Sequence, residues 1–399
     1  MPQRPTRVLL LGDELHASLG AVRALRAAGH EPWFAAPLSG TYASRSRTIA
    51  GTVTVPDPDR RPEDYVDAVL AATVRCSIDV VLPGTESSLV RLAGRAADFP
   101  PSVAVGAPDA EVVERVLDKA EVLRLAHEVG LETPETLAAE PDALAAEANR
   151  LTYPAILKPL RSKLATDDRM LRYVKAIRVE TPDQLRDVLS SLADETRVVQ
   201  PYIDGELAAV GGVAWNGELI CAVHQVARRI WPPHVGVSAY AATVPPDAEV
   251  ERRLAALVRR IGWSGVFEVQ FLRADGRRYL IDFNPRIYGS IALAVAAGQN
   301  LPAIWTELLL GRRPRSDSYR VGVRYRFEHN DVLALTRALV LGPRSEFIHG
   351  LVPRRRTVHA IFSLRDPGPL LTTLGKLKRR VGRAGVDRLL QKPATGREA

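Results

Sequence analysis

The stretch GVFEVQFLRADGRRYLIDFNPRIYGS, residues 265–290, is the most informative part of this chain. Apolar and polar residues alternate in its first half and again in its second half, and Asp275-Gly276 between them is a typical turn. Alternation with a period of two gives a strand one apolar and one polar face. The pattern therefore predicts a hairpin of two strands, Val266–Leu272 and Tyr279–Asn284.

The polar face of this hairpin carries two acids and an amide. An odd-membered loop centred on Asp275 would place Glu268 directly across from Asp282, where two carboxylates repel each other. A divalent cation would turn that repulsion into binding, and with Asn284 the acids form an oxygen-only set that suits Mg²⁺. The alternative is a surface hairpin whose acids face water, which is the common antiparallel arrangement. The apolar face is expected to hold Tyr279, Ile281 and Phe283.

The residues that follow the second strand favour the metal interpretation. Pro285 has no N–H and therefore ends the strand pairing. This places Arg286 just beyond the candidate metal ligands, where its fork of donors could hold a phosphate or a carboxylate.

Composition describes an ordinary globular protein. The chain has 399 residues, enough for two or three domains, with 46% hydrophobic and 25% charged residues and a net charge of +8. Basic residues do not interleave with aromatic ones and no nucleic-acid motif is present, so no nucleic-acid partner is expected. The basic run at 376–383 is interpreted as a solvated helix face. Two distant cysteines and the lack of a membrane-spanning run predict a cytoplasmic protein without a membrane partner.

Strand and helix patterns alternate from Arg7 to about Ala97, which predicts a doubly wound parallel sheet with flanking helices. Its first turn, GDELHASLG at 12–20, lacks the three-glycine spacing of a dinucleotide fingerprint, so no cofactor is assigned to this sheet alone. One continuous helix is expected from Ala110 to Val129. Further along, Asn216-Gly217 predicts a second hairpin.

In this order and spacing, the motifs resemble the ATP-grasp superfamily, in particular carboxylate–amine ligases related to the large subunit of carbamoyl-phosphate synthase. The resemblance covers residues 106–311 together with a preATP-grasp domain before them. It implies an α/β fold made of a doubly wound Rossmann-like domain, a two-lobed ATP-grasp domain with a lid at about 131–196, and a C-terminal extension that completes the body. The implied boundaries are 1–105, 106–311 and 312–399. The extension could serve substrate closure or dimerisation, so a homodimer is one option.

The resemblance also implies an ATP site. The family's two nucleotide lysines are matched by Lys119 and by Lys158, which ends the strand YPAILK. The segment VVQPYIDGE, at 198–206, matches the adenine hinge, with Glu206 expected on the ribose hydroxyls. The hinge residues expected to contact the nucleotide are Gln200, Tyr202, Ile203 and Glu206. The metal positions are matched by Glu268, Asp282 and Asn284, for Mg²⁺ or Mn²⁺, and Arg286 matches the arginine that steadies the transferred phosphoryl group.

Three positions depart from the family pattern. The segment PLRSKLATDDRMLRY, at 159–173, contains no glycine where the family often has a glycine-rich phosphate loop. Arg161 or Lys163 could substitute there by charge. Asp282 stands where glutamate is commoner, and Gln200 replaces a frequent glutamate in the hinge.

The implied activity is the ATP-dependent joining of a small carboxylic acid to an amine, with an amino acid as the expected substrate. The residues expected in catalysis are Lys158, Arg229, His234 and Arg286. Arg229 would bind a carboxylate, and His234 would assist amine deprotonation or have only a structural role. The residues expected to contact substrate are Glu86, Trp231, Tyr288 and Ser290. Other interpretations are a thiol acceptor, an ATP-dependent carboxylase of bicarbonate, and a nucleotide-binding regulator that has lost turnover.

Overall fold

The computed structural model describes residues 4–13, 15–160, 163–165, 171–173, 176–192, 195–314, 318–341, 347, 352 and 354–373. Only the backbone is described at 163–165 and 171–173. Two sequence predictions, the role of Arg161 and the helix face at 376–383, therefore lie outside the described residues, as does the side chain of Lys163.

The N-terminal part is a five-stranded parallel sheet, as predicted. The strand order β3-β2-β1-β4-β5 places the first strand in the middle, which is the doubly wound arrangement. The strands are β1 (Arg7–Leu11), β2 (Glu31–Ala36), β3 (Gly51–Thr54), β4 (Val80–Pro83) and β5 (Ala104–Val105). The helices are α1 (His16–Ala27), α2 (Pro62–Arg75) and α3 (Glu86–Leu92), followed by a 3-10 turn at Ala96–Asp98.

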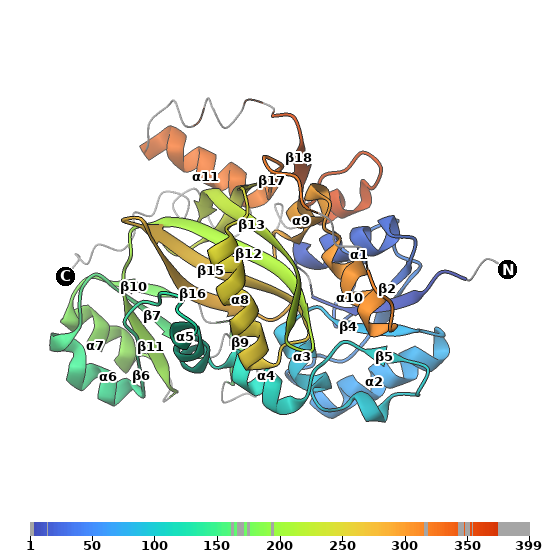
Figure 1. Ribbon diagram of the computed structural model, residues 1–399, viewed down its shortest axis with the longest axis horizontal. Coiled ribbons are helices and arrows are strands. Elements are labelled where there is room, and N and C mark those ends of the chain that lie inside the picture. The colour runs from blue at the N-terminus through green and yellow to red at the C-terminus, as the bar shows by residue number, and fades with distance from the viewer. Residues whose placement is uncertain are drawn as a thin grey trace.

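A smaller lobe lies at the opposite end of the molecule from the N-terminal sheet (Figure 1). Its antiparallel sheet has the order β10-β7-β11-β6 and packs against two helices over a core that includes Leu157 and Leu185. The elements are β6 (Leu137–Ala139), α6 (Pro141–Glu147), a 3-10 turn (Ala148–Arg150), β7 (Ala155–Pro159), β10 (Ile177–Val179), α7 (Pro182–Ser190) and β11 (Arg197–Pro201). A separate pair is formed by β8 (Lys163–Ala165) and β9 (Leu171–Tyr173).

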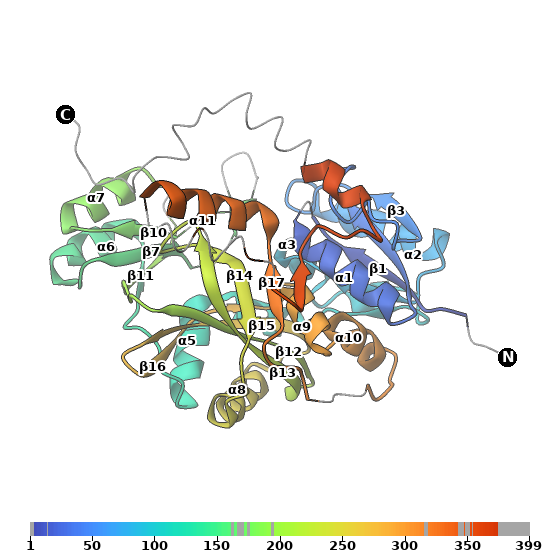
Figure 2. The same ribbon diagram turned by 90° about the horizontal axis from the view of Figure 1, so that it is seen from above.

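Between these parts runs a seven-stranded sheet with the order β16-β15-β12-β13-β14-β17-β18. Figure 2 shows this sheet between α8 on one side and α11 on the other. The strands are β12 (Glu206–Trp215), β13 (Glu218–Trp231), β14 (Val237–Thr243), β15 (Gly265–Ala274), β16 (Arg277–Asn284), β17 (Arg324–Arg326) and β18 (Thr357–His359). The helices are α8 (Ala248–Ile261), α9 (Ile291–Ala297), α10 (Leu301–Leu309) and α11 (Glu328–Leu341).

The helix predicted at 110–129 is two helices, α4 (Ala110–Leu117) and α5 (Lys119–Glu128). Asp118 separates them because its backbone is extended and its side chain accepts a hydrogen bond from the Glu121 N–H at 3.0 Å. An aspartate N-cap of this kind starts a new helix. Lys119 consequently begins α5 rather than lying within a longer helix.

The two faces of the large sheet pack against different cores. One face, with Phe267, Val269 and Phe271, packs under α8, α4 and α5. The other face contributes Val213 and Val266 to a core shared with α1, α9 and α10. The mixed α/β class is therefore confirmed, and the domain boundaries at 105 and 311 stay predictions.

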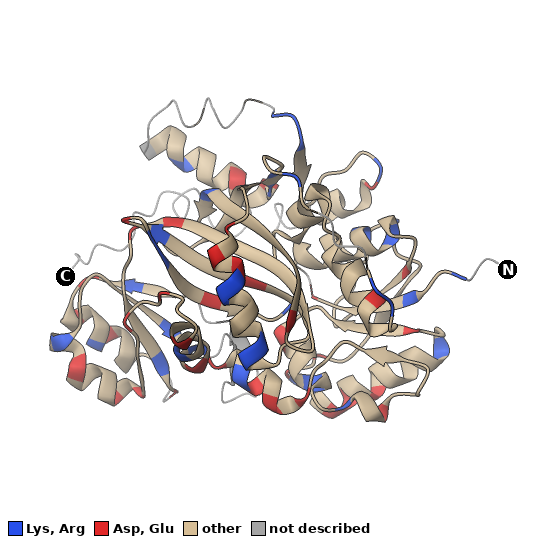
Figure 3. Ribbon diagram, viewed as in Figure 1, with Lys and Arg blue, Asp and Glu red and all other residues tan. Residues whose placement is uncertain are grey.

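Acidic and basic residues are interspersed over the described ribbon, and both signs alternate on the outer side of α8 (Figure 3). The net positive charge of the sequence is not gathered on one described element. Within the described residues, no helix has the length and apolar character needed to cross a membrane.

Candidate functional site

The β15–β16 hairpin forms with a two-residue turn. Ala274 pairs with Arg277, and Asp275 and Gly276 both have positive φ, at 50° and 74°. This is the tight turn that Asp-Gly favours. The register places Glu268 across from Asn284 and Gln270 across from Asp282. The predicted pairing of Glu268 with Asp282 is therefore wrong.

A β-bulge at Ile281 accounts for the difference. Leu280 pairs with Phe271 and Asp282 pairs with Gln270, so Ile281 is one residue more than the partner strand offers. A shift of one residue reverses the faces of every later side chain. Leu280, on the turn side of the bulge, pairs with Phe271 and lies in the core with 0% exposure, and beyond the bulge Asp282 lies on the same face as Glu268.

The prediction that Tyr279, Ile281 and Phe283 form the apolar face of the second strand is therefore only partly right. Phe283 is buried as expected, whereas Tyr279 and Ile281 are only half-buried. The bulge also leaves the Ile281 carbonyl available, and the Lys158 ammonium donates to it at 2.8 Å. Lys158 comes from β7 of the smaller lobe, so the bulge joins the two lobes at this site.

Glu268 is a buried acid held by neutral groups. It is 6% exposed, and its carboxylate accepts four hydrogen bonds. The donors are Gln225 at 3.2 Å, Gln270 at 3.1 Å, Asn284 at 3.3 Å and Ser290 at 3.4 Å. Burial raises the pKa of the Glu268 carboxyl above its usual range. No lysine or arginine among the described residues forms an ion pair with it at contact distance.

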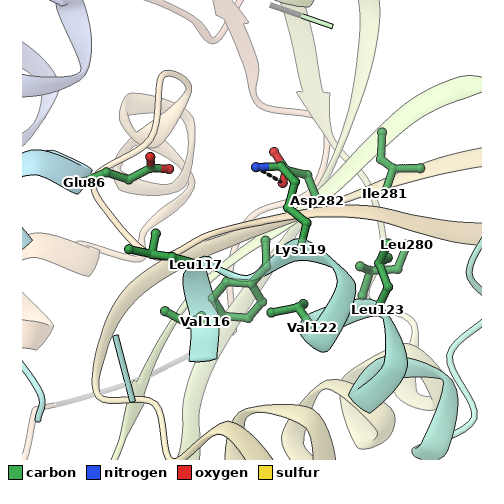
Figure 4. Close-up of a pocket in the computed structure, with 10 residues that line it drawn as sticks. Glu86, Val116, Leu117, Lys119, Val122, Leu123, Leu280, Ile281 and Asp282 are labelled. Atoms are coloured by element: carbon green, nitrogen blue, oxygen red, sulfur yellow. Dashed lines mark ion pairs between the residues drawn. The ribbon is translucent and has the colours of Figure 1, made fainter. Parts of the chain in front are cut away.

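Asp282 lies beside Lys119 (Figure 4), and its charge also acts on Lys158. Its Oδ1 atom is 3.6 Å from Lys119 Nζ and has no hydrogen-bond partner among the described residues, although it is buried. Burial lowers the pKa of Lys158 to about 8, and the Asp282 charge opposes that shift. Lys119, Asp282 and Glu86 also line one small pocket between α4, α5 and β16.

These residues fit a divalent cation. Glu268, Asp282 and Asn284 offer oxygen ligands on one face, one acid has no cation and the other has an unsatisfied buried oxygen. Hard cations such as Mg²⁺ take such oxygens and retain water and phosphate at their other positions. Within the described residues, no three His, Cys, Asp or Glu side chains lie close enough together to hold a metal ion. The amide oxygen of Asn284 is therefore needed as the third ligand.

Arg286 lies next to these ligands and reaches the N-terminal domain. Its Nη2 donates to Asn284 Oδ1 at 3.3 Å, and its Nε lies 3.8 Å from Glu86 Oε1. Glu86 is 7% exposed at the start of α3, immediately after Thr85, which caps that helix. Glu86 thus lies at the edge of the site with an arginine as its neighbour, and its contact with substrate stays a prediction.

The predicted adenine hinge lies at the end of β11, the strand that pairs with the Lys158 strand β7. Gln200 is buried, and its amide donates to Thr136 at 2.8 Å, while Ile203 is half-buried at the end of β11. Tyr202 lies under the Arg178 guanidinium, and its hydroxyl is 3.0 Å from His234 Nδ1. His234 is therefore next to the hinge, on the exposed β13–β14 loop.

Glu206 is not brought to the site. It pairs in register with Arg273 and forms ion pairs with Arg273 at 3.3 Å and Arg228 at 2.8 Å. Arg273 is two residues beyond Phe271 on β15, so both side chains lie on the α8 face, opposite Glu268. The predicted contact with ribose is therefore contradicted by the direction of this side chain.

The predicted acceptor residues have internal partners. Arg229 pairs with Asp331 at 2.6 Å and stacks on Tyr240, and Arg326 pairs with the same acid at 3.0 Å. Tyr288, expected as a substrate wall, is 1% exposed in the core, and Ser290 binds Glu268 instead of facing an open cavity. Trp231 is half-buried at the end of β13.

Sequence reasoning missed several residues of the site. Gln225 and Gln270 contact Glu268, and Arg326 and Asp331 surround Arg229. The alternation of β15 could have identified Gln270, because it lies two residues from Glu268 on the same face. The other three come from β13, β17 and α11, and no local pattern connects them to the hairpin.

Comparison with known proteins finds a family and relatives that this chain resembles in sequence. Residues 193–331 match a family described as "ATP-grasp in the biosynthetic pathway with Ter operon". The large chain of carbamoyl phosphate synthase from Gemmatimonas aurantiaca is 25% identical over 224 residues, which are 51% of this chain and 19% of that protein. The chain thus spans about a fifth of the length of that relative.

Solved structures share the fold. Biotin carboxylase from Campylobacter jejuni, in complex with β-γ-ATP, has a TM-score of 0.61 at 16% identity, covering 79% of this chain and 74% of that one. L-amino acid ligase from Bacillus licheniformis has a TM-score of 0.57 at 16% identity, covering 76% of this chain and 74% of that one. At these identities the likeness establishes the fold alone.

Proposed function

We propose that this chain, whose residues 193–331 match an ATP-grasp family, is an ATP-dependent ligase that joins a small carboxylic acid to an amine. The observation that supports this most is the face carrying Glu268, Asp282 and Asn284, on which Glu268 is buried without an ion-pair partner and Asp282 Oδ1 is buried without a hydrogen bond among the described residues. Lys119 and Lys158 reach this face from two other segments, and Arg286 extends it. Two acids, an amide and three cationic side chains suit a magnesium–nucleotide and its transferred phosphoryl group.

The proposed reaction has two steps. A carboxylate oxygen of the acid attacks the γ-phosphorus of ATP, the bond to the bridging oxygen breaks, and ADP and an acyl phosphate form. The amine nitrogen then forms a bond to the acyl carbon, the carbon–oxygen bond to phosphate breaks, and the amine loses a proton. The products are an amide, ADP and phosphate.

The side chains stabilise charge in these steps and do not form covalent intermediates. Lys119, Lys158 and Arg286 would neutralise negative charge on the β- and γ-phosphates as the phosphoryl group moves. Glu268, Asp282 and Asn284 would hold Mg²⁺, which supplies Lewis-acid neutralisation of phosphate oxygens when bound. The lobe that carries Lys158 would close over the site and exclude water from the acyl phosphate.

The acid is proposed to bind near Arg229. Arg229 and Arg326 share the single carboxylate of Asp331, which leaves one positive charge in excess. The Arg229 Nη2 atom is buried and has no hydrogen-bond partner among the described residues. A substrate carboxylate would satisfy that donor. The predictions of an amino-acid substrate, a cytoplasmic location and a homodimer are retained with this proposal.

The test is ADP release by the purified full-length chain with ATP, Mg²⁺ and a matrix of carboxylic acids, amino acids and bicarbonate. The proposal expects ADP and phosphate in equal amounts, only when an acid and an amine are both present, with the amide found by mass spectrometry. Turnover with bicarbonate alone would indicate a carboxylase. Nucleotide binding without ADP release anywhere in the matrix would support a regulator and overturn the ligase proposal.

A further inference from the structure

Two residues outside the metal-ligand set enclose one oxygen of Glu268. Gln225, on β13, is 4% exposed, and its amide Nε2 lies 3.2 Å from Glu268 Oε1 and 2.7 Å from Ser290 Oγ. Ser290, which immediately precedes α9, is 5% exposed and donates its hydroxyl to the same Oε1 atom at 3.4 Å. These three side chains form a closed, buried triangle.

The two oxygens of Glu268 therefore have different surroundings. Oε2 accepts hydrogen bonds from Gln270 and Asn284, which belong to the hairpin, and Asn284 is itself a candidate ligand. Among the described residues, Oε1 accepts hydrogen bonds from Gln225 and Ser290, which come from a different strand and from the start of a helix. Oε2 is thus the oxygen on the side where a cation would lie.

A glycine on the neighbouring strand leaves room for the segment that carries Ser290. Gly211 lies directly across from Glu268 on β12, and a Cβ atom at Gly211 would come within 2.0 Å of the Tyr288 hydroxyl. Glycine at this position therefore leaves space for Tyr288 under Glu268. Ser290 follows two residues later and reaches the carboxylate from that side.

We propose that Gln225 and Ser290 are positioning residues that fix the rotation of the Glu268 carboxylate and so direct Oε2 toward the metal. This inference rests on the proposed function, in which Glu268 is a metal ligand. The terminal torsion of a glutamate is broad, so an unsupported carboxylate would sample several orientations. Both supporting donors are neutral, and they therefore orient the carboxylate without competing with the cation for its charge. Partners of this kind usually contribute 10- to 100-fold to metal affinity.

The test measures Mn²⁺ binding to the full-length protein, in the presence of the non-hydrolysable nucleotide AMPPNP, by the electron paramagnetic resonance signal of free Mn²⁺. Gln225→Leu should raise the dissociation constant of Mn²⁺ by about 10- to 100-fold. Ser290→Ala should raise it less, because its hydrogen bond is the longer one. The matched control is Thr243→Val, since Thr243 is the register partner of Gln225 on β14, is 2% exposed and bonds to backbone carbonyls of Arg320 and Val323.

A second measurement separates positioning from general damage to the fold. If the defect is in metal binding, excess Mg²⁺ should restore the rate of ADP formation by Gln225→Leu toward that of the wild type. Circular dichroism and thermal unfolding check that the variant is folded, and Ser290→Ala decides the question if Gln225→Leu does not fold.

The possible results distinguish the two proposals. Wild-type binding that is lost in Glu268→Gln and weakened in Gln225→Leu supports both. Binding that depends on Glu268 but is equal in wild type, Gln225→Leu and Ser290→Ala overturns the positioning role alone. Wild-type binding that does not depend on Glu268 overturns the metal site and the positioning role together.

Discussion

Two buried carboxylates in this molecule have opposite electrostatic surroundings. Asp331, at the start of α11, is 2% exposed and lies between Arg229 at 2.6 Å and Arg326 at 3.0 Å. Glu268, on β15, is 6% exposed and accepts its hydrogen bonds from two glutamines, an asparagine and a serine. Both acids accept hydrogen bonds, and of the two only Asp331 has arginine partners at contact distance.

This difference indicates that Asp331 has a structural role and that Glu268 has a role in binding a ligand. A buried charge without a partner is costly, and proteins retain it where it binds a metal or acts in a reaction. Asp331 connects α11 to β13 and β17 through its ion pairs with the two arginines. Glu268 forms no such ion pair among the described residues, and the cation that would balance it is expected to come from solution.

The largest effect is expected from removing the unbalanced charge. Glu268→Gln keeps the shape of the side chain and should lower ATP-dependent turnover by about 10³-fold, or about 4 kcal/mol, because a bound metal supplies several kcal/mol of charge stabilisation. The rate of ADP formation in steady state measures it. Turnover equal to wild type would show that Glu268 is not a metal ligand.

The same comparison predicts opposite effects on stability. Asp331→Asn should lower the free energy of unfolding by about 3–5 kcal/mol, because it leaves two largely buried arginines without their acid. Glu268→Gln should not lower the stability of the metal-free protein, since it removes an unpaired buried charge. Urea unfolding of both variants without metal tests this. A loss of similar size in both would contradict the distinction between the two carboxylates.

A smaller effect is expected in the pH dependence of stability without metal. Burial raises the pKa of Glu268 in the folded protein above its unfolded value of about 4.3. Between these two values the folded state retains a proton that the unfolded state has released, so stability contributed by this group is present at low pH and is lost as pH rises through the folded pKa. Thermal unfolding of wild type and Glu268→Gln from pH 4 upward should show this decline only in the wild type. Parallel curves would rule it out.

The smallest effect is expected at an exposed carboxylate that also has two arginines. Glu206 pairs with Arg228 and Arg273, and all three side chains are more than a third exposed. Arg228→Ala should change the free energy of unfolding by less than about 1 kcal/mol, because solvent screens exposed ion pairs. Urea unfolding beside Asp331→Asn provides the comparison. A loss as large as that of Asp331→Asn would mean that burial does not decide the strength of these pairs.

Much of the fold could be predicted because its signals are local. Asp275-Gly276 and Asn216-Gly217 both form their turns, and the alternating pattern from Arg7 to about Ala97 forms the expected parallel sheet. The composition of the hairpin also identified Glu268, Asp282 and Asn284 as residues that share one face. Each of these features is encoded within a few residues of sequence.

The errors arise where distant segments decide the outcome. The bulge at Ile281 changes the register by one residue, and its carbonyl is bound by Lys158 from another lobe. The direction of Glu206 depends on its pairing with Arg273, and the environment of Arg229 depends on Asp331, about a hundred residues later. No pattern within a single strand contains that information.

Calorimetric titration of the protein with AMPPNP, with and without Mg²⁺, tests the central claim most directly. Wild type should bind the nucleotide much more tightly when Mg²⁺ is present, and Glu268→Gln should lose that dependence while retaining the weak metal-free binding. The same affinity with and without Mg²⁺ in the wild type, or the same dependence in wild type and Glu268→Gln, would contradict the assignment of this face as a magnesium–nucleotide site.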